Sequence, residues 1–176
     1  VAITATTDRI FDRARELGAG VFAATADLTD AAAVAGLFAA VTGALGPVEV
    51  LVNNAGMVQT GKSAKRSEVA GITDGAWQHH LALNMTTVFN CTRAALPAMQ
   101  AARHGRIVNI ASVTGPLVTI DGSAGYATAK AAVTGLTNLV DAVGGDDHFC
   151  AWRADGSAAC WGQNNDGQLG DGTFTD

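Results

Sequence analysis

The stretch Val-Glu-Val-Leu-Val-Asn-Asn-Ala-Gly, residues 48–56, passes from a short apolar run into small and polar side chains. Residues 48–52 predict a buried strand, and Asn53-Asn54-Ala55-Gly56 follows it directly. In a parallel sheet, ligands bind beyond the carboxyl ends of the strands, where small residues let a cofactor approach the backbone. Taken alone, the same four residues are also an ordinary turn, so their interpretation depends on the rest of the chain.

On both sides of this strand, short apolar runs alternate with longer amphipathic stretches, from residue 1 to about residue 139. Thr29 is the predicted N-cap of the second helix. Strands that alternate with helices imply parallel βαβ units. The predicted fold class is therefore α/β, with a partial Rossmann-like parallel sheet. Strands are predicted at residues 1–4, 21–24, 48–52 and 106–111, and helices at residues 8–17, 29–45, 74–102 and 126–139.

The composition excludes several classes of protein. The chain has 176 residues, 48% of them hydrophobic and 15% charged, which describes an apolar globular protein. A net charge of −5 gives no electrostatic basis for binding nucleic acid. No apolar run approaches the roughly 20 residues that cross a bilayer, and no signal peptide is recognisable, so we expect a cytoplasmic protein without a membrane partner. The chain opens on an apolar run without an initiator Met, and we interpret it as truncated at its start.

A tyrosine and a lysine at helical spacing are the strongest chemical signal. Tyr126 and Lys130 stand four positions apart, on one face of a predicted helix, and Ser112 follows the last strand of the α/β pattern. Reduction of a carbonyl needs a proton donor, and an ordinary tyrosine, with a pKa of about 10, is mismatched to neutral pH by roughly 4 kcal/mol. A neighbouring ammonium stabilises the phenolate and narrows this gap. Asn84, an amide within the apolar stretch 81–89, needs a partner or a functional reason.

In this order on an α/β pattern, these residues resemble the classical short-chain dehydrogenase/reductase family, most closely its 3-oxoacyl-(acyl-carrier-protein) reductase branch. The stretch His-Gly-Arg-Ile-Val-Asn-Ile-Ala-Ser, residues 104–112, is typical of that branch. The resemblance covers residues 1–139 and implies an oxidoreductase that transfers hydride between NADP(H) and a carbonyl or alcohol. It implies four catalytic roles: Tyr126 as general acid/base, Lys130 tuning it and binding the nicotinamide ribose, Ser112 orienting the substrate carbonyl, and Asn84 supporting a proton-relay water.

The resemblance also implies a cofactor site. Asp27 and the backbone at Leu28 would hold adenine, although an Asp before a helix is most often an N-terminal cap. No acidic residue stands directly at the end of the first strand, where it would bind a ribose 2′-hydroxyl and repel a 2′-phosphate. This absence, with Thr6 and Arg9 nearby, favours NADP, with NAD as the alternative. The cofactor-binding residues implied are Thr6, Arg9, Asp27, Leu28, Asn54, Ala55, Gly56, Tyr126 and Lys130.

Two parts of the family pattern have no counterpart in this sequence. The Gly-rich turn that presents backbone N–H groups to the pyrophosphate should precede Val1, together with the first strand. The segments that clamp the nicotinamide and cover the substrate should follow the helix at 126–139. In such sheets the absent strand lies between those at 1–4 and 48–52. We therefore expect either a split sheet or direct pairing of these two strands, with poor cofactor binding and little or no reductase activity by the chain alone.

From about residue 140 the composition changes to Gly, Asp and Asn, without a helical period. Runs at 149–152 and 158–161 flank Ala-Asp-Gly-Ser, residues 154–157, which predicts a β-hairpin. Cys-Trp-Gly at 160–162 and Gly-Gln-Leu-Gly-Asp-Gly-Thr at 167–173 resemble one repeat of the regulator of chromosome condensation type, a β-propeller unit. Because one repeat cannot bury a core alone, we expect a hairpin with a loose end.

The three cysteines do not form a disulfide framework. Cys91 is expected to be a small buried hydrophobe. Cys150 and Cys160 flank the predicted hairpin, where an oxidising setting would permit a disulfide and a cytosolic one would keep them reduced. No metal site is predicted, because the Asp- and Asn-rich run at 164–171 lacks the bidentate Glu of a calcium loop.

The main hypothesis is a partial reductase domain, residues 1–139, joined to a single propeller-type repeat, residues 140–176. The rival hypotheses are a propeller-type interaction protein defined by the tail, and a non-catalytic fusion product. For the reductase we expect a small-molecule carbonyl or alcohol as partner, no nucleic acid, and a homo-oligomer contact through the helical residues 76–102 and 126–139.

Overall fold

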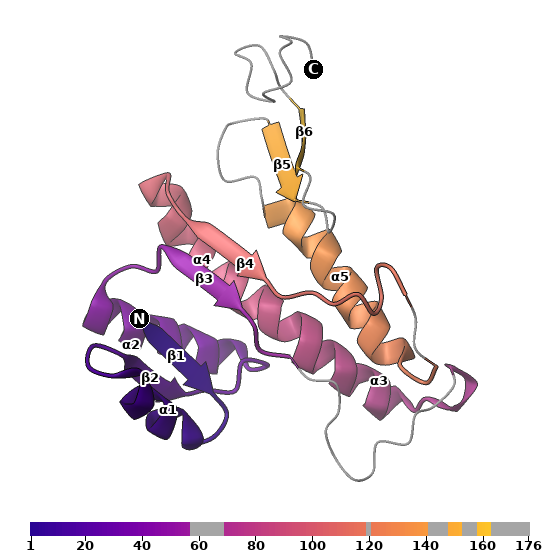
Figure 1. Cartoon of the computed structure of the whole chain (residues 1–176), viewed down its shortest axis with the longest axis horizontal. Helices are drawn as coiled ribbons and strands as arrows, with labels where there is room; N and C mark the ends of the chain where they lie inside the picture. The colour runs from indigo at the N-terminus through magenta and orange to yellow at the C-terminus, as the bar shows by residue number, and fades with distance from the viewer. Residues whose placement is uncertain (57–68, 119–120, 141–147, 153–157, 163–176) are drawn as a thin grey trace.

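The computed structural model describes residues 1–56, 69–118, 121–140, 148–152 and 158–162 (Figure 1). Strands and helices alternate along the chain, which confirms the predicted α/β class. The elements are β1 (Ala2–Ala5), α1 (Arg9–Leu17), β2 (Phe22–Thr25), α2 (Ala31–Leu45), β3 (Val50–Asn53), the 3-10 turn η1 (Val69–Gly71), α3 (Asp74–Leu81), the π-helical turn η2 (Ala82–Thr86), α4 (Thr87–Ala102), β4 (Arg106–Asn109), α5 (Ala124–Val140), β5 (His148–Trp152) and β6 (Ala158–Gly162).

The parallel strands form two separate pairs. β1 pairs with β2, with Ala2 opposite Phe22, and β3 pairs with β4, with Val50 opposite Arg106. No ladder joins β1 to β3 in the described part of the chain. Of the two expected outcomes, a split sheet is therefore the one observed. Because no ladder connects the pairs, their relative placement depends on the packing of their helices.

Two helices bury one face of the β3–β4 pair. α4 packs on β3 and α5 packs on β4. The inner face of α4 carries the apolar stripe Val88, Cys91, Ala95 and Met99, each at most 4% exposed, with the spacing of one helical face. At the end of this layer the Met99 side chain packs directly on the backbone of Gly105, where an added Cβ would lie 2.5 Å from Cγ of Met99.

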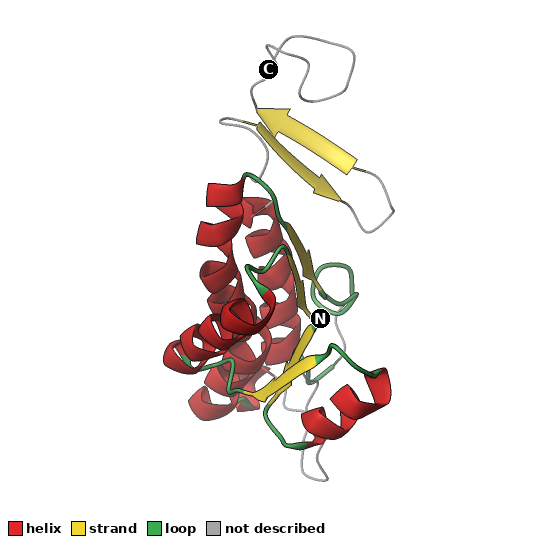
Figure 2. Ribbon diagram, turned by 90° about the vertical axis from the view of Figure 1, so that its left-hand side faces the viewer, coloured by secondary structure: helices red, strands yellow, loops and turns green. Residues whose placement is uncertain are grey.

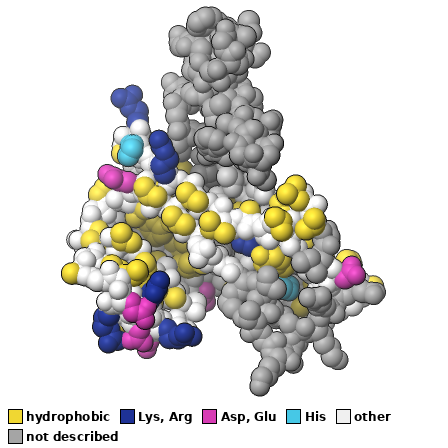
Figure 3. Space-filling model, in the orientation of Figure 1, with side chains coloured by type: hydrophobic (Ala, Val, Ile, Leu, Met, Phe, Trp, Pro, Cys, Tyr) yellow, Lys and Arg dark blue, Asp and Glu magenta, His cyan; other side chains and the backbone are white. Residues whose placement is uncertain are grey.

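The other face of the same pair is exposed. Side chains alternate along a strand, so Val50 and Val52, which are 60% and 56% exposed, point away from the helices. The exposed neighbours are Val108 on β4 and Ile110 just beyond its end, at 45% and 42%. Figure 2 shows β3 and β4 with the long helices on one side only, and Figure 3 shows hydrophobic side chains gathered across the molecule's face. The β3–β4 pair is thus covered on one face and bare on the other.

The N-cap predicted for α2 was wrong by one residue. The cap is Asp30, whose Oδ1 accepts a hydrogen bond from the Ala32 N–H at 2.8 Å. The Thr29 hydroxyl instead donates to Oδ1 of Asp27 at 2.7 Å, and Thr29 lies one residue before the position at which the helix is capped. α2 ends at Gly46, whose φ of 88° lies in the left-handed region that favours glycine.

The single helix predicted at 74–102 is observed with a change of winding in its middle. Residues of η2 form a π-turn between α3 and α4, and Asn84 lies within it. Such turns insert one extra residue into a helix and occur often at functional sites. Among the helices that the structure describes, none is long and apolar enough to cross a membrane.

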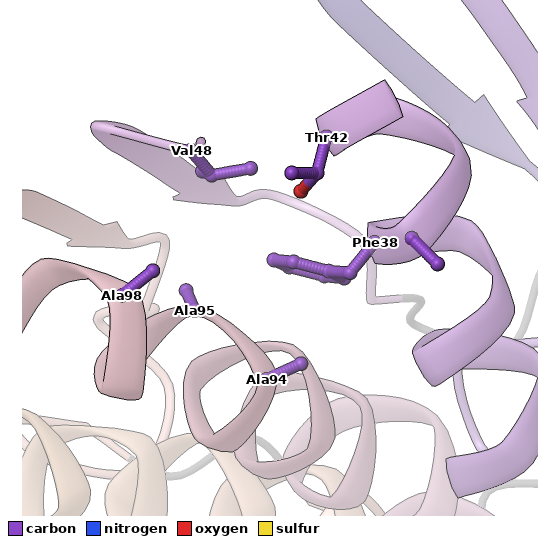
Figure 4. Close-up of a pocket in the computed structure, with 7 residues that line it drawn as sticks. Phe38, Thr42, Val48, Ala94, Ala95 and Ala98 are labelled. Atoms are coloured by element: carbon purple, nitrogen blue, oxygen red, sulfur yellow. The ribbon is translucent and has the colours of Figure 1, made fainter. Parts of the chain in front are cut away.

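A small cavity of about 270 Å³ separates α2 from α4 (Figure 4). Its lining is Phe38, Ala39, Thr42, Val48, Ala94, Ala95 and Ala98. The pocket opens to solvent, and the short alanine side chains of α4 leave room opposite Phe38. None of the predicted catalytic or cofactor-binding residues lines this cavity.

The predicted C-terminal hairpin is present as the antiparallel strands β5 and β6. Their register places the Cα of Cys150 opposite that of Cys160, and Trp152 opposite Ala158. The predicted turn at residues 154–157 and the Asp- and Asn-rich run at 164–171 lie outside the described residues.

The register predicts a disulfide between Cys150 and Cys160 under oxidation. Directly opposed residues of antiparallel strands have Cα atoms about 4.5–5.5 Å apart, which a disulfide spans. Incubation with oxidised glutathione should remove two hydrogen atoms from the intact mass and link the peptides that contain these cysteines. Cys91 is the internal control, because burial raises the pKa of its thiol to about 11, which suppresses the reactive thiolate. Both tail thiols remaining alkylatable would contradict this prediction.

Candidate active site

Tyr126 and Lys130 lie in the first two turns of α5. Lys130 is 4% exposed, and its Nζ donates a hydrogen bond to the carbonyl of Ile110 at 2.7 Å, just beyond the end of β4. Tyr126 is half-buried one turn earlier. Their separation of four positions places the hydroxyl and the ammonium on the same side of the helix.

The buried ammonium gives the folded chain a predicted pH dependence. Burial lowers the pKa of Lys130 below its ordinary value of 10.5, so in alkaline solution the unfolded state binds more protons than the folded state. The contribution of Lys130 to the free energy of unfolding therefore rises as the pH increases toward 10.5. Lys130→Met removes this charge at similar length. Urea unfolding should show that the free energy of unfolding of wild type increases relative to that of Lys130→Met between neutral and alkaline pH. A difference between the two proteins that does not change with pH would contradict the assignment.

Asn84 is fully buried on the π-turn. Its Nδ2 donates a hydrogen bond to the carbonyl of His80 at 3.1 Å. A Cβ added to Gly56 would lie 2.9 Å from Oδ1 of Asn84 and 3.1 Å from Nζ of Lys130. The amide, the ammonium and the glycine backbone therefore meet at one point beyond the carboxyl ends of β3 and β4, and only a residue without a side chain fits there.

Ser112 stands in the loop that follows β4. Its Oγ accepts a hydrogen bond from the backbone N–H of Thr114 at 3.1 Å. Gly115, with φ of 116°, presses this loop onto α5, because a Cβ there would lie 2.2 Å from the carbonyl oxygen of Ala127. The loop of Ser112 is thus packed against the helical turn that carries Tyr126.

His80 and Gly125 were not predicted as site residues. The Cδ2 atom of His80 would lie 2.8 Å from a Cβ on Gly125, the residue before Tyr126. Burial, and then the charge of His79, lower the pKa of His80, so its neutral form is favoured at this contact. His80 holds Asn84 with its carbonyl and packs against α5 with its ring. A single sequence carries no signal for this contact, because it depends on how α3 and α5 cross.

The first residue of Asn53-Asn54-Ala55-Gly56 faces the core. Asn53 is 7% exposed, and its Nδ2 donates to Oγ1 of Thr92 at 3.2 Å and to Oδ1 of Asn109 at 2.8 Å. Asn109 in turn donates to Oγ1 of Thr137 at 3.0 Å. This chain of bonds ties β3 and β4 to both long helices, while Asn54, Ala55 and Gly56 remain exposed beyond the strand.

The predicted adenine-side residues belong to the other strand pair. The Oδ1 atom of Asp27 accepts from the N–H and the hydroxyl of Thr29, at 2.9 and 2.7 Å. These bonds hold the pKa of the exposed Asp27 carboxyl below its ordinary value, and neither uses Oδ2. Thr6 and Arg9 are exposed after the end of β1. The structure therefore brings Asn84, Lys130 and Gly56 together. The adenine-side residues belong to the β1–β2 pair, which no strand ladder among the described residues joins to the β3–β4 pair.

The chain belongs to the short-chain dehydrogenase family, whose sequence model matches residues 1–143. A second sequence model, of the regulator of chromosome condensation (RCC1) repeat, matches residues 140–168. Both resemblances inferred from the sequence are confirmed. The class of protein that the fold and the site define is therefore the short-chain dehydrogenase family.

Individual relatives agree with this class. The chain is 43% identical over 129 residues to "Inactive 2-(S)-hydroxypropyl-CoM dehydrogenase 2" of Xanthobacter autotrophicus, covering 73% of this chain and 53% of that protein. It is 33% identical to 3-oxoacyl-(acyl-carrier-protein) reductase FabG of Staphylococcus aureus, covering 74% and 50%. A crystal structure of a short-chain dehydrogenase/reductase from Burkholderia xenovorans superposes with a TM-score of 0.69 at 32% identity, covering 80% of this chain and 55% of that one. The chain thus spans about half the length of the relatives it matches.

Proposed function

We propose that residues 1–139 carry the machinery for hydride transfer between NADP(H) and a carbonyl or alcohol, of the 3-oxoacyl reductase kind, and that the chain alone performs this reaction weakly. The supporting observation is the meeting of Asn84, Lys130 and Gly56 beyond β3 and β4. The similarity to a 3-oxoacyl reductase supports the substrate class. The similarity to a relative whose name describes it as inactive is consistent with low activity in a member of this family.

In this proposal Tyr126 gives a proton to the developing alkoxide, and Ser112 holds the substrate oxygen. The Lys130 ammonium would bind the nicotinamide ribose beside Tyr126. The Ile110 carbonyl fixes that ammonium with a hydrogen bond of 2.7 Å. Asn84 supports a proton-relay water. These roles divide proton transfer and orientation among four side chains.

The cofactor assigned is NADP, with NAD as the alternative. Bound nicotinamide would supply or accept the hydride. The residues present fit the two ends of such a molecule: Gly56 leaves the backbone open beside Lys130, and Oδ2 of Asp27 is free to accept from an adenine amino group. Thr6 and Arg9, which are exposed after β1, would hold a 2′-phosphate, and the backbone at Leu28 would bind adenine together with Asp27.

The proposed domain division is residues 1–139 for the reductase part and residues 140–176 for the repeat. We propose a small carbonyl or alcohol substrate, a cytoplasmic location and no nucleic-acid partner. A homo-oligomer would use α3, α4 and α5. On α4 the half-exposed Phe89 ring, with the Arg93 guanidinium 4.7 Å from its centroid, is a suitable contact.

Substitution of Gly56 tests the meeting point on which the proposal rests. Gly56→Ala places a methyl group 2.9 Å from Oδ1 of Asn84 and 3.1 Å from Nζ of Lys130, so the Asn84 amide must shift and the flexible lysine end must give way. We expect at least about a tenfold loss of reductase rate with little loss of stability, since a displacement of about 1 Å can cost far more than this in catalysis. The matched control is Gly43→Ala in α2, where a Cβ meets nothing within 4 Å. Equal rates for both variants would overturn the proposal.

The repeat match supports a second candidate, an interaction protein in which the tail is the functional part. β5 and β6 are the described elements of this tail, and a propeller blade needs neighbouring repeats. The gene sequence that follows this region would distinguish the reductase from the interaction protein. Further repeats at a spacing of about 50 residues would favour the interaction protein.

A further inference from the structure

Asn90 connects the two strand pairs. It lies on α4 and is 4% exposed. Its Nδ2 donates hydrogen bonds to the carbonyls of Leu28 at 3.1 Å and Thr29 at 3.2 Å, across more than 60 positions of sequence. Its Oδ1 accepts from Nη2 of Arg93 at 3.1 Å. Both ends of the amide are therefore used, which fixes its orientation.

The carbonyls that Asn90 holds belong to the turn at residues 27–30. Within this turn, Oδ1 of Asp27 accepts hydrogen bonds from the N–H and the hydroxyl of Thr29. The Asp30 N–H donates to the carbonyl of Asp27 at 3.1 Å. The turn is thus fastened internally by Asp27 and to α4 by Asn90.

In the described part of the chain, the hydrogen bonds we observe between residues 1–46 and the β3–β4 unit are these two from Asn90. No strand ladder joins the units. The remaining α2–α4 contact contains the cavity opposite Phe38 (Figure 4). Asn90 therefore supplies directional hydrogen bonds beside the non-directional α2–α4 packing, and these bonds align the turn with α4.

We propose that Asn90 is a positioning residue that sets the turn at residues 27–30 relative to Asn84, six positions earlier on the same helical stretch. This inference rests on the proposed function, in which Asp27 holds adenine and Asn84 serves the reaction centre. Asn90 touches neither cofactor nor substrate. It fixes the distance between the two ends of the cofactor site, and it governs the affinity for the adenine end.

The test uses the full chain labelled for NMR, with AMP as the probe of the adenine end and nicotinamide mononucleotide as the probe of the other end. Asn90→Ala removes both donors, and we expect AMP to bind about tenfold more weakly, the loss of one or two modest hydrogen bonds. Binding of nicotinamide mononucleotide should change less than twofold. Backbone amides at residues 29–34 should exchange with solvent faster, because the turn loses its tether.

The control variant is Arg93→Ala, which removes the partner of Oδ1 but leaves both Nδ2 donors, and should change AMP binding less than twofold. If Asn90→Ala does not fold, Asn90→Ser, which keeps one donor, should give an intermediate loss. Equal weakening of both probes, or unchanged AMP binding, would overturn the inference. If wild type binds no AMP, the proposed adenine site fails, and hydrogen exchange alone then decides the tether: faster exchange in Asn90→Ala supports it, and unchanged exchange overturns it.

Discussion

Replacement of Tyr126 by Phe is expected to lower the rate of carbonyl reduction by about 10²–10⁴-fold, the usual contribution of a positioned acid/base group. The ring that packs in the first turns of α5 is kept, and the proton donor is lost. Because the chain alone is expected to turn over slowly, the measurement is single-turnover oxidation of NADPH at high protein concentration, with a short-chain 3-oxoacyl thioester as substrate.

The matched control for this variant is Thr128→Ala, an exposed position on the same helix. It should leave both rate and stability close to wild type, since exposed substitutions away from special features have small effects. A Tyr126→Phe rate equal to that of wild type would instead support a non-catalytic product, in which α5 has a structural role only.

NADPH is expected to bind this chain with a dissociation constant in the millimolar range, about a thousandfold weaker than a micromolar site, which corresponds to roughly 4 kcal/mol. The described residues offer contacts to the two ends of the cofactor, on strand pairs that no ladder joins. They include no Gly-rich turn that would present backbone N–H groups to the pyrophosphate.

Fluorescence titration with NADPH measures this affinity directly, and NADH is the matched comparison. If Arg9 favours the 2′-phosphate, NADPH should bind more tightly than NADH, and Arg9→Glu should reverse the order. A saturable NADPH titration at micromolar affinity would contradict the expectation of a weak site.

Much of the fold followed from local pattern. The apolar runs ending at Asn53 and near Ser112 predicted strands, and β3 and β4 lie there. The spacing of Tyr126 and Lys130 required a helix, and α5 provides it. Errors fell at element ends, as at the cap of α2, because Asp27, Thr29 and Asp30 compete for the same few hydrogen bonds and sequence does not rank them.

The sequence by itself determined the α/β class and the family, since these depend on periodicity and on residue type at fixed spacing, and it supplied the residues that we propose for proton transfer. Only the tertiary structure showed that Gly56 meets Asn84 and Lys130, that His80 packs on Gly125, and that Asn90 holds the turn at residues 27–30. Each of these contacts joins elements that are distant in sequence. Their geometry is set by how helices cross and strands pair, and no local pattern encodes it.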